Sequence, residues 1–144
     1  MGLDAVVYRN IQTLAPALRE RVRIADPETG ELDFVSQGPP DPNYNDALLA
    51  ISIRIGNAAS VGWLREQINS RWNGDCDILL NKVLFSGSHS GDFINLKGAE
   101  AMRREIDKIG VTQGQLPEAL DEFLKQMRQL LDVADAEKNP IVFV

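Results

Sequence analysis

Strong strand-forming residues stand at both ends of this chain, and their placement constrains the fold more than any other feature. Residues 3–8 read Leu-Asp-Ala-Val-Val-Tyr, and residues 141–144 read Ile-Val-Phe-Val, a segment too short to form a helix. Apolar residues fall on both faces of the first segment, which is typical of a strand covered on both sides. We therefore predict that the first and last strands pair within one sheet.

A hairpin is predicted near the N-terminus. Polar and apolar residues alternate at 21–25 and again at 31–35, around the turn sequence Asp-Pro-Glu-Thr-Gly. Proline presets the φ angle of a turn and glycine supplies a positive φ, so this sequence can reverse the chain. The alternation predicts one solvent-facing side and one core-facing side, the latter formed by Val22, Ile24, Leu32 and Phe34.

Helical periodicity dominates the second half of the chain. Apolar residues recur at helical spacing over 58–72, over 99–109 before Gly110, and over 116–134, which predicts three helices. A short helix is also predicted at 13–20, with Pro16 in its first turn. Three proline residues make 36–45 a loop. The apolar runs 47–55 and 78–85 fit a strand or a helix, and the sequence leaves both alternatives open.

Length and composition place these elements in one domain. With 144 residues, 44% of them hydrophobic, the chain can bury a core without disulfides or metal. Its single cysteine and single histidine cannot form a zinc site of the usual Cys and His spacing, and we expect neither a metal nor a cofactor. We predict a single α+β domain over 1–144, with a mainly antiparallel sheet, paired terminal strands and helices on one face.

The charge distribution bears on the class of partner. The formal net charge is −6, and acidic residues outnumber basic ones in both halves of the chain. We therefore expect no direct binding of nucleic acid, which requires clustered positive charge. An acidic surface fits a basic protein partner, although the same charge also simply maintains solubility. Without a basic leader or an apolar run of membrane-spanning length, the sequence predicts a soluble cytoplasmic protein that does not bind membranes.

The segment 86–92 concentrates groups that could carry chemistry. It contains three serines, the only histidine and an aspartate, namely Ser86, Ser88, His89, Ser90 and Asp92. A serine nucleophile with His89 as base and Asp92 as orienting acid would make a small hydrolase. Such triads usually draw their members from separate elements, and the central residue between Gly87 and Gly91 is histidine rather than the serine of a nucleophile elbow. The pattern favours a glycine-permitted turn over a catalytic site.

Two aromatic residues are candidates for contact with a partner. Trp63 lies about 100° from Leu64 on the predicted helix, at the side of its apolar stripe. An exposed tryptophan is a frequent interface anchor, but Trp63 could instead pack under the loop 36–45, and Tyr44 in that loop has the same two interpretations. A structural subunit of a homo-oligomer would associate through the apolar runs 47–55 or 78–85.

Several short segments carry a resemblance that spans most of the chain. They are Met1-Gly2-Leu3-Asp4, Ile55-Gly56-Asn57 followed by Leu64-Arg65-Glu66, residues 84–92, and Asn139-Pro140-Ile141-Val142-Phe143. Together they resemble a loose group of small uncharacterised bacterial proteins, some of which are similar to immunity proteins of polymorphic toxin systems. The resemblance implies a protein that protects its host cell by occluding a cognate toxin domain. In that interpretation His89, Asp92 and the neighbouring serines would contact the toxin.

Overall fold

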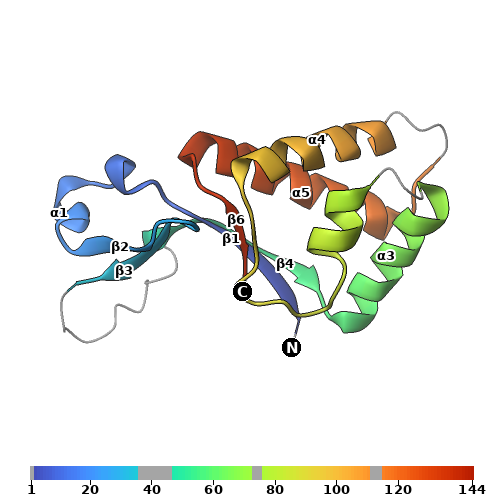
Figure 1. The fold of residues 1–144 in the computed structure, drawn as a ribbon, viewed down its shortest axis with the longest axis horizontal. Helices are drawn as coiled ribbons and strands as arrows, with labels where there is room; N and C mark the ends of the chain where they lie inside the picture. The colour runs from blue at the N-terminus through green and yellow to red at the C-terminus, as the bar shows by residue number, and fades with distance from the viewer. Residues whose placement is uncertain (1, 36–46, 73–75, 111–114) are drawn as a thin grey trace.

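The first and last strands pair at the centre of a four-stranded sheet, as predicted (Figure 1). The computed structural model describes residues 2–35, 47–72, 76–110 and 115–144. The strands of the main sheet are β1 (Leu3–Tyr8), β4 (Leu49–Gly56), β5 (Phe93–Ile94) and β6 (Ile141–Phe143). They pair antiparallel in the order β4-β1-β6-β5, which leaves β4 and β5 at the two edges.

Three long helices pack together against one face of this sheet and give the predicted α+β fold (Figure 1). They are α3 (Ala58–Arg71), α4 (Leu96–Gly110) and α5 (Glu118–Glu137). The Asn57 side chain accepts a hydrogen bond from the Ser60 amide at 2.8 Å and so caps the start of α3. Lys138 adopts a left-handed conformation and ends α5 just before Asn139 and Pro140.

The main core lies between these helices and the sheet. The predicted apolar stripe of α5 is buried from Leu120 to Ala134, and Leu3, Ala5 and Val7 of β1 are fully buried opposite it. Each fully buried large apolar side chain stabilises the fold by about 1.5–3 kcal/mol relative to exposure. The run 78–85 is helical rather than a strand over its first part, in a short helix at 77–83 that includes the π-helical turn η2 (Leu79–Val83). Its apolar residues up to Leu84 join the main core, whereas Phe85 is exposed. The run 47–55 supplies β4.

The hairpin forms a separate two-stranded sheet, away from the main one (Figure 1). Its strands are β2 (Val22–Asp26) and β3 (Glu31–Phe34), and two short helical turns, η1 (Ile11–Thr13) and α1 (Pro16–Arg19), precede it. Pro16 is the first residue of α1, as the sequence predicts. A small second cluster of buried residues holds this part together: Leu14, Val22, Leu32 and Leu48.

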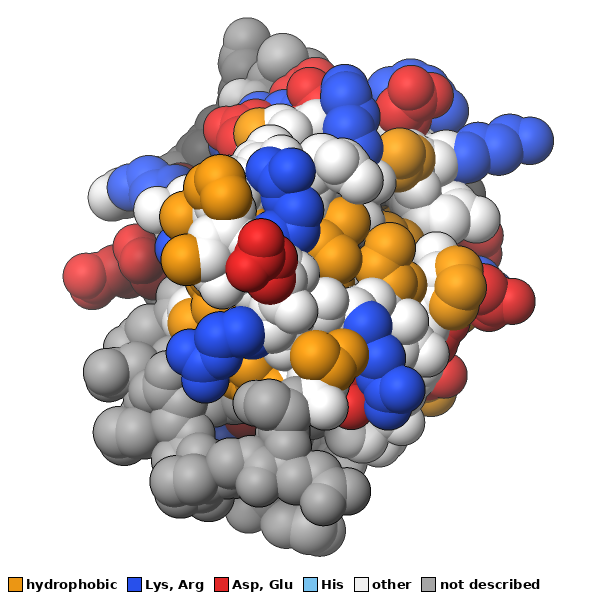
Figure 2. Space-filling model, turned by 90° about the vertical axis from the view of Figure 1, so that its left-hand side faces the viewer, with side chains coloured by type: hydrophobic (Ala, Val, Ile, Leu, Met, Phe, Trp, Pro, Cys, Tyr) orange, Lys and Arg blue, Asp and Glu red, His pale blue; other side chains and the backbone are white. Residues whose placement is uncertain are grey.

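The prediction that Ile24 faces the core is wrong. Its side chain is 47% exposed, although its cross-strand partner Leu32 is 1% exposed. Among the described residues, the second cluster does not extend over Ile24, and the hairpin belongs to a sheet separate from the one that carries the main core. Figure 2 shows this end of the molecule, where hydrophobic side chains lie among side chains of both charge signs.

The whole of the loop 36–45, including Tyr44, lies outside the described residues. No helix in the described part of the chain combines the length and hydropathy that a membrane span requires.

Candidate functional site

The glycine- and serine-rich segment 86–92 is a turn held against β6. The Gly91 amide donates to the Phe143 carbonyl at 2.9 Å, and the Phe143 amide donates to the Asp92 carbonyl at 2.9 Å. Gly91 has a φ of +96°, which disfavours any side chain. A Cβ atom at Gly87 would lie 2.7 Å from the Cα atom of Ala58, at the start of α3. Both glycines therefore have a structural explanation.

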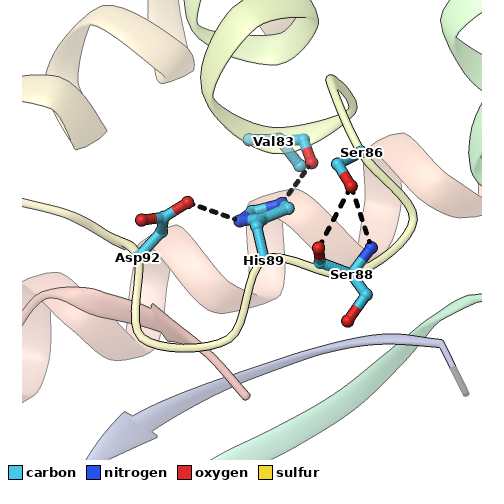
Figure 3. Close-up of polar contacts among 5 residues, drawn as sticks. All are labelled: Val83, Ser86, Ser88, His89 and Asp92. Atoms are coloured by element: carbon cyan, nitrogen blue, oxygen red, sulfur yellow. Dashed lines mark hydrogen bonds and ion pairs between the residues drawn. The ribbon is translucent and has the colours of Figure 1, made fainter.

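His89 lies inside this turn, and its side chain is only 5% exposed (Figure 3). Its Nε2 atom is 2.8 Å from the Val83 carbonyl oxygen. Because a carbonyl can only accept, Nε2 carries the proton and donates it. The imidazole also packs between two phenylalanine rings, with centroid distances of 4.4 Å to Phe85 and 4.5 Å to Phe143. His89 thus connects the end of η2 to β6.

Asp92 approaches the other nitrogen of His89. Asp92 Oδ2 is 3.2 Å from His89 Nδ1, which is an ion-pairing distance. Nδ1 is buried and has no hydrogen-bond partner among the described residues. The contact between Asp92 and His89 is therefore electrostatic and not a hydrogen bond.

The three serines do not complete a triad. Ser86 Oγ donates to the Ser88 carbonyl at 3.0 Å and accepts from the Ser88 amide at 3.3 Å, which closes a local turn (Figure 3). The Ser88 and Ser90 side chains are exposed. None of the three hydroxyls is hydrogen-bonded to His89 in the described structure. The Nε2 atom of His89 is instead hydrogen-bonded to the Val83 carbonyl. The arrangement does not provide a serine nucleophile activated by this histidine.

A groove between α3 and α5 is a stronger candidate for a binding site. Its volume is about 540 Å³, and its floor is formed by Ile55 at the end of β4, Leu64 of α3 and Phe123 of α5. Trp63 lines one side and is 38% exposed, whereas Glu122 contributes a carboxylate from the opposite helix. The groove offers an exposed indole beside an apolar floor, a combination that suits an inserted apolar side chain.

Sequence reasoning identified Trp63 but missed the groove. The periodicity of 58–72 correctly placed the indole beside the apolar stripe of its helix. The opposite wall comes from Ala119 and Glu122 of α5, almost 60 residues further along the chain. No short-range pattern indicates that these two helices meet, so the groove emerges only from the tertiary packing. Packing of Trp63 under the loop 36–45 falls outside the described residues.

A second group that the sequence did not reveal is the buried carboxylate of Glu105. Its two oxygens accept hydrogen bonds from the amides of Ile78 and Leu79, at 2.9 and 3.0 Å. Burial raises the pKa of Glu105, and this effect outweighs the two amide donors, which lower it. Glu105 therefore caps the start of the 77–83 helix from the neighbouring helix α4, which is a structural role.

Comparison with known proteins adds no identification. No family model, no curated protein and no solved structure matches this chain. Within the residues that the structure describes, no group of three or more His, Cys, Asp or Glu side chains is arranged to hold a metal ion. The resemblance to immunity proteins stays a prediction.

Proposed function

We propose that this protein binds another protein through the groove between α3 and α5, and that it acts as an immunity-type inhibitor of a bacterial toxin. The observation that carries the proposal is the exposure of Trp63 over an apolar floor. Tryptophan is among the residues most often found at the energetic centre of protein interfaces, because it buries a large rigid surface and retains a polar N–H.

Charge defines the partner further. Glu122 stands at the groove, and Glu66 is exposed one helical turn after Trp63. The chain as a whole carries a net charge of −6. An acidic surface accelerates association with a basic partner and disfavours acidic ones. A basic toxin domain is the partner that this proposal specifies.

The sequence predicted that segment 86–92 contacts the partner, whereas this proposal assigns the main contact to the groove. The His89 side chain is 5% exposed and is hydrogen-bonded to the Val83 carbonyl, so its ring offers a partner almost no surface. Ser88, Ser90 and Asp92 are exposed, and their contact with a partner stays a prediction. No observed geometry favours the hydrolase alternative.

The proposal is tested by co-purification and rescue. The tagged protein is expressed with the products of the genes beside its own, and any captured protein is tested for toxicity with and without it. The expected result is a one-to-one complex and survival of cells that would otherwise die. Absence of both a stable complex and rescue for every neighbouring product would refute the immunity role.

A further inference from the structure

Within the residues that the structure describes, no strand pairs with the outer edge of β4. Two backbone hydrogen bonds establish which way the backbone groups of β1 point: the Val144 amide donates to the Asp4 carbonyl at 3.0 Å, and the Arg9 amide donates to the Leu48 carbonyl at 3.0 Å. Backbone groups alternate in direction along a strand, so Asp4 and Val6 face β6, whereas Ala5 and Val7 face β4.

The same alternation extends to β4 itself. Ala5 is opposite Ile53 and Val7 is opposite Ile51, so these two isoleucines direct their amides and carbonyls toward β1. Ser52 and Arg54 must then direct theirs away from the sheet. No other strand in the described part of the chain pairs with that side of β4.

The central part of this edge carries little protection against strand addition. β4 is eight residues long and contains no proline or lysine. Its register with β1 is regular from Ile51 to Arg54, and irregularities lie on either side of that stretch, between Leu49 and Ile51 and between Arg54 and Gly56. Its single charged side chain, Arg54, is 3.3 Å from Asp4 on its own neighbouring strand. A regular edge stretch without proline or lysine can serve as a template for another strand, and here that stretch runs from Ile51 to Arg54.

The edge is continuous with the Trp63 groove. Ile51 and Ile53 are partly exposed and pack at the margin of the main core, and Ile55, on the same face of β4, forms part of the groove floor. A strand laid along β4 would therefore bring its side chains on the helix-covered face toward Trp63 and Phe123. Backbone pairing would supply affinity and the groove would supply specificity, as in other cases of strand addition.

We propose that the partner adds an extended segment to the outer edge of β4, places an apolar side chain in the Trp63 groove, and carries basic residues. This inference rests on the proposed function and names the mode of recognition. Charge selects this occupant over a second copy of the chain, because two copies would each bring a net charge of −6 and a Glu122 carboxylate to the contact. The hairpin end in Figure 2 is a weaker candidate, since it mixes both charge signs.

Amide hydrogen exchange tests strand addition without a known partner. The probe is a capped peptide as long as β4 in which lysine alternates with valine, and its control has glutamate in place of lysine. Saturating lysine peptide should slow exchange at the Ser52 and Arg54 amides at least about tenfold and leave the Ile51 and Ile53 amides, which already face β1, unchanged. The glutamate peptide should bind at least about tenfold more weakly at low salt.

Three results would overturn the inference: no binding of the lysine peptide, unchanged exchange at Ser52 and Arg54, or equal binding of the two peptides. Slowed exchange at these amides in the protein alone, with a dimer in sedimentation, would assign the edge to a second copy instead.

Substitution at Ser52 separates this inference from the proposed function. Ser52→Pro removes an outward amide but none of the bonds to β1, and Ser52→Ala retains that amide. With a captured partner, Ser52→Pro should weaken binding at least about tenfold relative to Ser52→Ala, with both variants folded by circular dichroism. If Ser52→Pro leaves capture intact while Trp63→Ala abolishes it, the result supports partner binding at the groove and refutes strand addition.

Discussion

Replacing Glu105 with glutamine should destabilise the fold, although the two side chains have nearly the same shape. Both carboxylate oxygens of Glu105 are used, one by the Ile78 amide at 2.9 Å and one by the Leu79 amide at 3.0 Å. Glutamine has a single oxygen, and its NH2 group would face a backbone N–H. One of the two amides, in a region where Leu79 is fully buried, would lose its acceptor.

The expected decrease in the free energy of unfolding follows from the number of hydrogen bonds that are lost. An unsatisfied buried donor costs about 1–3 kcal/mol, and a hydrogen bond to a charged group contributes about 1.5–3 kcal/mol. Relief of the desolvated charge offsets part of this loss. We expect Glu105→Gln to lower the free energy of unfolding by about 1–3 kcal/mol, and Glu105→Ala by about 2–4 kcal/mol, because alanine leaves both amides without an acceptor.

Urea denaturation followed by far-ultraviolet circular dichroism measures these differences. The matched control is Glu100→Gln on the same helix, where the side chain is exposed and the expected change is within about 0.5 kcal/mol. A Glu105→Gln variant as stable as the wild type at neutral pH would refute the capping role.

The pH dependence of the free energy of unfolding, compared between the wild type and Glu105→Gln, is a second test of the role of Glu105. Because burial raises the pKa of Glu105 in the folded protein, the folded state binds this proton more tightly than the unfolded state. Its contribution to stability is complete below the unfolded pKa and declines as the pH rises through the folded pKa. The stability of the wild type relative to Glu105→Gln should therefore be greatest in acid and decrease toward neutral pH.

Two other substitutions test the structural role of segment 86–92. Gly87→Ala should lower the free energy of unfolding by about 1–3 kcal/mol, because its Cβ would meet the Ala58 backbone, whereas Gly62→Ala, with open space on α3, should raise it by up to about 1 kcal/mol; equal thermal melting of both variants would contradict this. His89→Ala should cost about 2–4 kcal/mol in chemical denaturation through loss of the Val83 bond and of ring packing, and a captured partner should still bind the folded variant with wild-type affinity; a large loss of affinity would instead make His89 part of the interface.

The sequence predicted the elements whose pattern is local. Apolar spacing located α3, α4 and α5, and strand formers at the two ends located β1 and β6, because each pattern reflects burial of one face against a single core. Pairing of the two ends could also be predicted, since the short last segment needs a partner strand to satisfy its backbone groups.

What the sequence could not reveal depends on distant contacts. Ile24 follows a regular alternation yet is exposed, because the alternation does not show that the hairpin leaves the main core. Glu105 lies within the buried row of α4, and its acceptor role depends on amides 26 and 27 residues away. The Trp63 groove likewise requires α5 beside α3. The serine, histidine and aspartate residues of 86–92 are types that often form active sites, but in the structure this segment is a turn.

The affinity of a captured partner for the Trp63→Ala variant tests the central claim most directly. The matched control is Leu96→Ala, which removes an equally exposed apolar side chain from α4, outside the groove between α3 and α5. Titration calorimetry with folded proteins should show at least about a 30-fold loss of affinity for Trp63→Ala, together with loss of rescue, and little change for Leu96→Ala. Wild-type affinity and rescue by Trp63→Ala would contradict the assignment of the groove as the partner-binding site.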